Sequence, residues 1–326
     1  MIGGGPAGAA AATTLARTGR TVLLLDDSVA GSTWRVGEGA PPGLDRAVDD
    51  VFGSGTFVAA DHVPSYANRS AWGSDRTVDT EFMFNPFGAG WHLDRVAFDT
   101  RLLEIASAAG VTVRTETVDG NWIAETPFVV DASGRRAVFA RRHGARLVNE
   151  DRLIAAVAVF PRSAEDEDTT TTVEAVESGW WYTSAIPGSR RVVALLTDGD
   201  LLPSGIRRAE RFAELVATTH HVASLVDGQP EPPRLVAAGS GYLDRPSGDG
   251  WVAVGDAAAC FDPLSSQGLL TAVLMGSLVA EGITDPDGYV ARYRAIVDHY
   301  RTERLAVYAL EQRWPNSPFW SRRHRP

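Results

Sequence analysis

A glycine-rich turn at the start of the chain constrains the fold of everything that follows it. Met1 and Ile2 end a strand, glycines stand at positions 3, 5 and 8, and an alanine-rich stretch over 9–16 predicts a helix. A strand, a G-x-G-x-x-G turn and a helix in this order form the dinucleotide-binding fingerprint, because the amides at the helix N-terminus attract a pyrophosphate. The predicted pyrophosphate ligands are Gly3, Gly5, Pro6, Ala7 and Gly8.

A second strand, over residues 21–25, supports this interpretation. It is a continuous apolar run of the kind found in buried parallel strands, and it ends at Asp26 and Asp27. Asp26 stands about 20 residues after Gly3, the spacing at which an acid binds the ribose hydroxyls of such a nucleotide. We predict Asp26 as the ribose ligand and Asp27 as its more solvated neighbour at the same site. The alternative is an ordinary strand-helix-strand turn with a solvated acidic loop.

The composition excludes several classes of function. A net charge of −10 argues against nucleic acid as a partner, because no basic surface is available to neutralise phosphates. The chain has no lysine, which excludes Schiff-base chemistry, and its single cysteine, Cys260, excludes an internal disulfide and a thiolate metal site. No apolar run reaches the ~18 residues of a membrane span. We therefore expect a cytoplasmic enzyme without a membrane partner.

The first strand is unusually short. Only two residues precede the glycine turn, whereas strands usually have about five or six residues. We therefore expect that native residues are missing before Met1, and that the short joins at 117–127 and 281–287 are abridged loops. An intact mass equal to that of the 326 residues would contradict this expectation.

A second strand-turn-helix unit lies far along the chain. The apolar run 251–255 ends at Gly255 and Asp256, and a polar turn over 263–268 precedes an apolar helix over 269–280. Asp256 can accept a hydrogen bond from a ribityl hydroxyl, and amides at the helix N-terminus can stabilise negative charge on a reduced isoalloxazine ring. This pattern fits a large cofactor better than NAD alone. The ligands predicted here are Gly255, Asp256, Pro263, Ser265, Ser266, Gln267 and Gly268.

Two arginines are assigned to the same cofactor. Arg95 follows the predicted N-cap Asp94 in the first turn of a helix, where the helix dipole disfavours a cation. A bound anion would explain this placement, so we predict Arg95 as a second pyrophosphate ligand; the alternative is a surface arginine. Arg35, in the glycine- and proline-rich loop 34–42, is the other predicted cofactor ligand.

Three residues are candidates for catalysis. His92 is a possible proton shuttle, because histidine titrates near neutral pH, although a structural histidine is the common alternative. Trp181 and Tyr182 lie on the first strand of a hairpin predicted over 179–198, and we expect both to line the substrate cavity. Packing against the sheet is the alternative for these aromatic side chains.

Several motifs together resemble a known group of enzymes. The residues 3–8, 131–134 and 255–263, with Asp131 ending a buried strand, are similar to the three FAD motifs of the flavoprotein monooxygenase superfamily with the para-hydroxybenzoate hydroxylase fold. The resemblance implies that Asp131 contacts FAD. Further stretches resemble the tryptophan-halogenase-like flavoproteins that help to mature quinone-cofactor amine dehydrogenases and amino-acid oxidases by oxygenating a peptidyl tryptophan. These stretches are 70–74, 85–95, 179–182, 262–268 and 313–320.

The resemblance covers nearly the whole chain and implies an α/β fold. It consists of a Rossmann-type FAD-binding domain, an inserted substrate domain with a mixed or antiparallel β-sheet, and C-terminal helices. We place the FAD-binding domain in the segments 1–70, 93–160 and 246–285. The substrate domain takes 71–92 and 161–245, and a helical tail takes 286–326.

The resemblance also implies an activity. NADPH or NADH, bound transiently, would reduce FAD, and O2 would add to the flavin as a C4a-hydroperoxide that hydroxylates an electron-rich aromatic substrate, tryptophan-like and free or peptidyl. Flavin halogenases carry a catalytic lysine and a Trp-x-Trp-x-Ile-Pro motif. This chain has no lysine, and its stretches 180–182 and 185–187 do not match that motif, so halogenation is not expected.

Two other functions stay open. The same fold resembles flavin-dependent reductases of C=C bonds, which need no oxygen. The chain could also be a FAD-binding maturation protein without its own turnover, which contacts a partner protein through its C-terminal tail. The tail interleaves arginines with Trp314, Phe319 and Trp320, as interface hot spots do, although it could equally pack onto its own domain.

Overall fold

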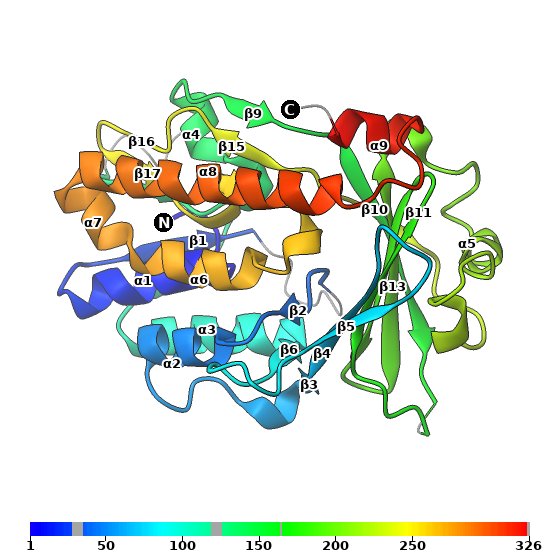
Figure 1. Ribbon diagram of the computed structural model, residues 1–326. Coiled ribbons are helices and arrows are strands. Elements are labelled where there is room, and N and C mark those ends of the chain that lie inside the picture. The colour runs from blue at the N-terminus through cyan, green and yellow to red at the C-terminus, as the bar shows by residue number, and fades with distance from the viewer. Residues whose placement is uncertain (28–34, 119–125, 164, 325–326) are drawn as a thin grey trace. The chain divides into compact units, whose positions relative to one another are not determined.

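The computed structural model describes residues 1–27, 35–118, 126–163 and 165–324, which form two compact units. Unit 1 contains residues 1–58, 95–150 and 240–300, and unit 2 contains residues 59–94, 151–239 and 301–326 (Figure 1). The chain therefore passes between the units several times, as an inserted domain requires. The chain passes from one compact unit to the other after residues 58, 94, 150, 239 and 300. The domain borders expected from the sequence, at 70, 92, 160, 245 and 285, stay predictions.

Unit 1 is built on a mainly parallel sheet. In it β1 (Leu23–Asp26) pairs with β7 (Thr112–Thr115), and β8 (Val129–Asp131) pairs with β17 (Trp251–Ala253), both in parallel. Ile2 joins the two pairs, because it forms parallel bridges to Leu25 and to Asp131. The short β16 (Ser247–Gly248) adds an antiparallel edge to β17. The first strand of the fingerprint is thus a single bridged residue at the centre of the sheet.

Helices cover this sheet within unit 1. Five of them are α1 (Pro6–Arg17), α2 (Leu44–Phe52), α3 (Arg95–Ala108), α6 (Gly268–Ser277) and α7 (Val279–Thr284). The alanine-rich α1 and the small residues of α6 allow these two helices to lie side by side (Figure 1). A smaller antiparallel sheet contains β9 (Leu147–Asn149), β15 (Gly241–Leu243) and β18 (Ala259–Cys260), and the buried thiol of Cys260 points to the carbonyl of Gly241.

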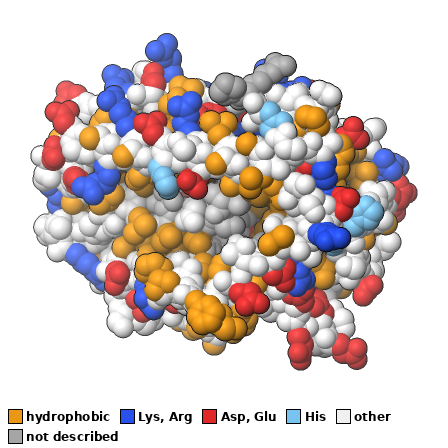
Figure 2. Space-filling view, viewed as in Figure 1, with side chains coloured by type: hydrophobic (Ala, Val, Ile, Leu, Met, Phe, Trp, Pro, Cys, Tyr) orange, Lys and Arg blue, Asp and Glu red, His pale blue; other side chains and the backbone are white. Residues whose placement is uncertain are grey.

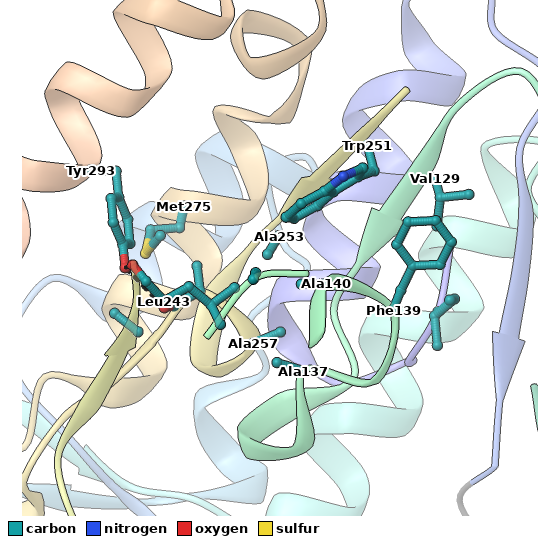
Figure 3. Packing of buried hydrophobic residues seen from close by; sticks show 14 of the residues in the cluster. Val129, Ala137, Phe139, Ala140, Leu243, Trp251, Ala253, Ala257, Met275 and Tyr293 are labelled. Atoms are coloured by element: carbon teal, nitrogen blue, oxygen red, sulfur yellow. Dashed lines mark hydrogen bonds between the residues drawn. The ribbon is translucent and has the colours of Figure 1, made fainter. Parts of the chain in front are cut away.

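A hydrophobic cluster of unit 1 lies between α4 (Val138–Arg142), the sheet and α8 (Pro286–Ala309). Phe139 packs edge-on against Trp251, with ring centroids 6.2 Å apart, and Met275 and Tyr293 belong to the same cluster (Figure 3). This packing holds β17 and the segment that follows it, where the predicted Gly255 and Asp256 lie.

Unit 2 is built on a seven-stranded sheet. Its strands follow the order β14 (Arg234–Ala237), β10 (Leu153–Pro161), β13 (Arg190–Asp198), β12 (Gly179–Ile186), β11 (Thr171–Val176), β4 (Ala67–Ala71) and β5 (Val78–Glu81). Only the pair of β11 and β4 is parallel, and the hairpin predicted over 179–198 is formed by β12 and β13. The helix α5 (Ala209–Val216) packs through Phe212 and Val216 on one face of the sheet. Outside this sheet, β3 (Val63–Ser65) pairs with β6 (Gly90–His92).

The C-terminal helices complete the architecture. The helix α8 contributes its residues up to Tyr300 to unit 1 and the rest to unit 2, and α9 (Pro318–Arg323) belongs to unit 2. The expected fold class, a Rossmann-type α/β domain with an inserted mixed and antiparallel sheet and C-terminal helices, is confirmed. None of the helices formed by the described residues is long and apolar enough to span a bilayer.

Candidate functional site

In the glycine turn of unit 1, Gly3 and Gly8 pack tightly against other backbone atoms, whereas Gly5 has free space beside it. Gly3 has φ +98°, and a Cβ atom on it would lie 2.3 Å from the carbonyl oxygen of Ala132. A Cβ atom on Gly8 would lie 1.9 Å from the carbonyl oxygen of Gly3, so these two glycines permit close backbone packing. Around the Cβ position of Gly5, in contrast, no atom of the described residues lies within 4 Å, apart from those of its own chain neighbours. The turn therefore leaves room at Gly5 for a ligand.

The N-terminus of α1 suits an anionic ligand. Gly5 is the N-cap and offers no side chain to the first-turn amides, Pro6 takes the first helical position, and the first turn contains no acidic residue. The first amides of an α-helix have no partner within the helix, and the helix dipole adds positive potential there. The predicted turn 3–8 thus has the chemistry that a pyrophosphate requires.

Asp26 and Asp27 have different surroundings. Asp26 ends β1 and lies beside the turn, because its carboxylate is 2.9 Å from the position that a Cβ atom on Gly4 would take. Asp27 is exposed and forms an ion pair of 2.7 Å with Arg136. Asp26 therefore stays the predicted ribose ligand, and Asp27 is the outer residue of the two, with an arginine as its partner.

Arg35 and Arg95 share one buried carboxylate, that of Asp99 on α3. Arg35 Nη1 lies 2.7 Å and Arg95 Nη2 3.1 Å from Asp99 Oδ2. Arg95 also donates hydrogen bonds to the carbonyl oxygens of Val36 and Gly37. The unfavourable position of Arg95 in the first turn of α3 is therefore explained by its i,i+4 partner Asp99, and the bound anion inferred from the sequence is not needed. Both arginines fasten the loop at 35–37 to α3.

Asp131 differs from its predicted role. It is fully buried at the end of β8, and its carboxylate accepts hydrogen bonds from the amide and hydroxyl of Ser133 and from the amides of Phe139 and Ala140. A side chain with no accessible surface cannot contact a cofactor that enters from solvent. Asp131 instead holds the loop 132–137 and the first turn of α4, so the predicted contact with FAD is wrong in this structure.

Asp256 follows β17 directly, and its side chain is partly accessible. Arg135 Nε is 3.6 Å from Asp256 Oδ2. The surrounding protein desolvates the carboxyl group and raises the pKa of Asp256, while the positive charges of Arg135 and Arg95 act in the opposite direction. A partly desolvated carboxylate gains from a hydroxyl donor that replaces water. Asp256 thus stays the predicted ribityl ligand.

The loop before α6 is organised by Asp262. Its buried carboxylate accepts from the amide of Leu264, its amide donates to the hydroxyl of Tyr300, and its carbonyl accepts from the hydroxyl of Ser265. Ser266 then adopts a left-handed conformation with φ +51°. The loop contains the predicted residues Pro263, Ser265, Ser266, Gln267 and Gly268.

The N-terminus of α6 resembles that of α1 in its chemistry. Gln267 is the N-cap without a capping side chain, the first turn has no acidic residue, and Gln267 and Gly268 are exposed. Unit 1 therefore presents two helix N-termini that can accept negative charge. The residues of both turns fit a flavin dinucleotide, which carries negative charge at its diphosphate and, when reduced, on its ring.

His92 is a structural residue of unit 2 and not a proton shuttle. It is buried, and its Nε2 atom lies 2.8 Å from the hydroxyl of Thr171 on β11. Burial, reinforced by the positive charge of Arg191, lowers the pKa of His92 to about 3. The imidazole therefore stays neutral at physiological pH, and the predicted catalytic role is wrong.

Trp181 and Tyr182 face opposite sides of the sheet in unit 2, since neighbouring residues of a strand alternate. Trp181 is buried under α5, with its ring centroid 5.4 Å from that of Phe212 in an edge-to-face contact. Tyr182 is partly accessible, and its hydroxyl donates to Ser184. The prediction that Trp181 lines the substrate cavity is therefore wrong, and Tyr182 stays a candidate.

The C-terminal tail packs within unit 2. Phe319 and Trp320 are fully buried, and the ring of Trp314 is stacked 6.4 Å from that of Trp320. The Arg323 guanidinium lies over the ring of Phe319 and bonds to the buried Asp198, 2.7 Å away. These aromatic side chains do not form the exposed hot spot that the partner hypothesis requires. The tail shows the alternative arrangement, packing onto its own unit.

Sequence reasoning missed Asp99, Arg135 and Tyr300 as residues that shape this site. The i,i+4 spacing of Arg95 and Asp99 on one predicted helix was a usable signal. Tyr300 is 38 residues from Asp262 in the sequence, so no local pattern connects them. Arg135 is near Asp256 only because β8 and β17 are adjacent in the sheet.

Comparisons with known proteins agree with this reading of unit 1. The family model described as tryptophan halogenase matches residues 55–325. The chain is 31% identical to the putative FAD-dependent oxidoreductase LodB of Marinomonas mediterranea, over 99% of this chain and 96% of the relative. This match confirms the group predicted from the motifs.

Solved structures share the fold. The flavin-dependent halogenase CmlS has a TM-score of 0.82 and 24% identity, over 99% of this chain and 66% of that one. The peptidyl tryptophan dihydroxylase QhpG, described as essential for tryptophylquinone cofactor biogenesis, has a TM-score of 0.77 and 23% identity, over 99% and 77% of the two chains. From the two anion-accepting helix N-termini, the family match and the similarity to LodB, we conclude that the chain belongs to the tryptophan halogenase family and is an FAD-dependent oxidoreductase.

Proposed function

We propose that the protein is an FAD-dependent monooxygenase that hydroxylates an electron-rich aromatic ring, a tryptophan side chain within a polypeptide. The observation that carries the proposal is the pair of helix N-termini in unit 1, at Gly5 and at Gln267, neither of which has a capping side chain or an acid in its first turn. The names of the relatives support the oxidoreductase class through LodB and the substrate class through QhpG. Oxygenation is favoured over halogenation because the chain has no lysine.

In this proposal, different residues of unit 1 bind different parts of the cofactor. The amides of the turn 3–8 hold the diphosphate, Asp26 binds the ribose and Asp256 binds a ribityl hydroxyl. The first turn of α6 stabilises negative charge on the reduced ring. Bound FAD supplies the redox chemistry, with NADPH or NADH, bound transiently, as the source of two electrons and O2 as the acceptor.

The protein's own contribution is binding, orientation and the exclusion of water. Per turnover, one atom of O2 enters the aromatic ring as a hydroxyl group and the other leaves as water, while one NADPH or NADH is oxidised. His92 is not assigned a proton transfer, because its burial keeps the imidazole neutral. Tyr182 is the aromatic residue we propose for orienting the substrate ring, since it is partly accessible and Trp181 is not.

The experiment is isotope transfer from O2. The full chain is reconstituted with FAD, supplied with NADPH or NADH in parallel, and given either a tryptophan-containing peptide or free tryptophan under ¹⁸O2. We expect a flavin absorbance spectrum and a peptide product that carries ¹⁸O, with less product from free tryptophan. The proposal fails if no flavin binds, if chloride or bromide enters the product, or if a C=C bond is reduced without oxygen, which is the signature of a flavin-dependent reductase.

A further inference from the structure

Bulky hydrophobic side chains are exposed together in unit 2, around the loop that follows β5. Phe84 is 92% exposed, Met83 74% and Phe87 52%, and Tyr66, just before β4, is 63% exposed. Soluble proteins scatter single apolar residues over their surfaces, whereas gathered ones mark interaction sites. We call these four residues the apolar cluster.

Hydrogen bonds hold the apolar cluster in a defined shape. The amide of Phe82 donates to the carbonyl of Tyr66 at 2.8 Å, which ties the loop to the start of β4. Two successive turns follow, from the amide of Asn85 to Phe82 and from the amide of Gly88 to Asn85. The side chain of Asn85 also accepts from the amide of Phe87 at 2.9 Å. The exposed rings are therefore presented by an organised loop.

The apolar cluster adjoins a free edge of the seven-stranded sheet. β5 is the last strand in the sheet order, it pairs only with β4 among the described strands, and its four residues are all exposed. An edge strand offers a row of unpaired amides and carbonyls to another extended chain. Such strand addition gives affinity through the backbone, while neighbouring side chains set the specificity. Residues 82–88 continue directly from this strand.

The surroundings of the edge are acidic. Arg69 on β4 is shared between Asp79 at 2.9 Å and Asp168 at 3.0 Å, so its positive charge is already neutralised. In the stretch 165–168, Asp166 and Asp168 are likewise paired with arginines. The exposed acidic side chains near this edge are Glu81 on β5, Glu165 and Glu167. In Figure 2 hydrophobic side chains protrude along the lower edge of the view, and acidic side chains gather at its lower right. A docking segment that carries positive charge is favoured here.

We propose that an extended segment of a partner protein binds at this edge. Its backbone pairs with β5, its apolar side chains cover the apolar cluster, and its Lys or Arg side chains meet the acidic rim. A second copy of this chain is disfavoured because its net charge is −10, and an anionic membrane is disfavoured by the same repulsion. The inference rests on the proposed function in one respect, namely that the partner is the protein that carries the tryptophan to be hydroxylated.

The test uses two short fluorescein-labelled peptides and the full-length, FAD-reconstituted protein. In one peptide valine alternates with lysine around a central tryptophan, and in the other glutamate replaces lysine. Fluorescence anisotropy should show that only the lysine peptide binds. Phe84→Ser and Glu81→Lys should each weaken binding about tenfold or more, as at interface hot spots. Val148→Ser is the control, because Val148 is 38% exposed but lies on β9 of unit 1, and it should leave binding unchanged.

Several outcomes would overturn the inference. They are equal binding of both peptides, unchanged peptide binding by the Phe84→Ser variant, or an equal loss of binding in the Val148→Ser variant. Sedimentation that shows a dimer lost on Phe84→Ser would assign the surface to a second copy, and Phe84-dependent flotation with phosphatidylserine vesicles would assign it to a lipid surface. If the Phe84→Ser protein unfolds at a lower urea concentration than the wild type, its loss of binding could reflect misfolding. The binding measurement is then made with Met83→Ser, at another exposed residue of the apolar cluster.

The docking inference and the proposed function can fail separately. Flavin absorbance and the NADPH- or NADH-dependent consumption of O2 with free tryptophan are measured on each variant. A docking defect should leave both readouts at the wild-type level. A wild-type protein that binds the lysine peptide but neither holds flavin nor consumes O2 would contradict the proposed function and leave the docking surface standing.

Discussion

The hydroxyl oxygen of Tyr300 on α8 accepts a hydrogen bond of 2.7 Å from the backbone amide of Asp262. The same oxygen lies 2.6 Å from the hydroxyl of Ser240, and the Tyr300 ring lies 4.3 Å from that of Phe261. A helix distant in the sequence thus positions the loop that leads into α6. Since the first turn of α6 is predicted to face the flavin ring, we expect Tyr300 to position the cofactor through this loop.

The substitution Tyr300→Phe tests this relationship. It removes a partly buried hydroxyl that bonds to both Asp262 and Ser240, for which we expect a cost of about 0.5–1.5 kcal/mol and an FAD dissociation constant raised by about two- to tenfold. Tyr293→Phe on the same helix is the control, because its hydroxyl donates to Leu243 and Ala258, away from the loop. Both variants should lose similar stability in urea, but only Tyr300→Phe should lose FAD affinity in a fluorescence titration. Equal FAD affinities would rule out the positioning role.

Gly5→Ala and Gly8→Ala should separate ligand binding from folding. A methyl group at Gly5 meets no other part of the described chain within 4 Å, and the backbone at φ −67° accepts alanine, so the free energy of unfolding should change by about 0.5 kcal/mol or less. The same methyl group occupies the space predicted for the diphosphate, and FAD affinity should fall at least about tenfold. Gly8→Ala forces a contact with the Gly3 carbonyl and should cost about 1–3 kcal/mol of stability. A Gly5→Ala protein that binds FAD normally would place the diphosphate elsewhere.

Asp198 should be essential to the stability of the tail. Burial alone would raise the pKa of Asp198, but hydrogen bonds and positive charge from Arg323 and Arg322 outweigh burial and hold it below the ordinary value. Asp198→Asn leaves the buried Arg323 guanidinium without its carboxylate and should cost about 3–5 kcal/mol in urea unfolding at pH 7. Asp200→Asn, at an exposed partner of Arg322, should leave the free energy of unfolding nearly unchanged, because solvent screens this ion pair.

The effect of Asp198 should depend on pH in a defined direction. Because the folded-state pKa lies below the unfolded-state value of 3.8, the contribution of the carboxylate is complete above that value and is lost as the pH falls through the folded-state pKa. The stability difference between wild type and Asp198→Asn should therefore shrink in acid below about pH 4. A difference that is the same at pH 7 and pH 3 would contradict the ion-pair interpretation.

His92 should stay neutral across the physiological range. Its folded-state pKa of about 3 lies below the ordinary value of 6.5, so between these values the unfolded chain binds more protons than the folded one. Stability should consequently fall as the pH drops below 6.5, and His92→Asn should reduce the steepness of that fall. Nitrogen NMR of the imidazole should show no titration between about pH 5 and 8. A titration midpoint near 6.5 would restore the shuttle hypothesis.

Trp181 and Tyr182 should respond differently to substitution. Trp181→Ala empties a buried site under α5, and we expect a loss of about 3–5 kcal/mol in unfolding free energy. Tyr182→Phe removes one partly accessible hydroxyl, costs about 1 kcal/mol or less, and should alter turnover with the peptide substrate. A fully stable Trp181→Ala protein with an altered Michaelis constant would return Trp181 to the substrate site.

The sequence predicted best what local chemistry determines. The turn at Gly3, Gly5 and Gly8 follows from backbone sterics and helix polarity, and the structure gives each glycine a distinct geometry. The strand-turn-helix at Asp256 and Gln267 was recognisable for the same reason. The parallel sheet then follows because buried apolar strands that alternate with helices have few other arrangements.

Predictions that depended on packing were less successful. Arg95 was assigned to an anion although Asp99, one helical turn later, satisfies it. His92 is buried beside Thr171, which lies on a different strand far along the chain, and no local pattern reveals this neighbour. Strand alternation already implied that Trp181 and Tyr182 could not line one cavity, but which of the two faces α5 emerged only with the sheet.

The burial of Cys260 in β18 has a practical consequence for labelling. The chain has one thiol, it is shielded by the small antiparallel sheet of unit 1, and there is no lysine side chain to react with electrophiles. Maleimide reagents attack accessible thiolates and should leave the wild-type side chains almost untouched. A cysteine introduced at Phe84→Cys would therefore be a unique attachment point for a spin label or a fluorophore, which could report the arrival of a partner in real time.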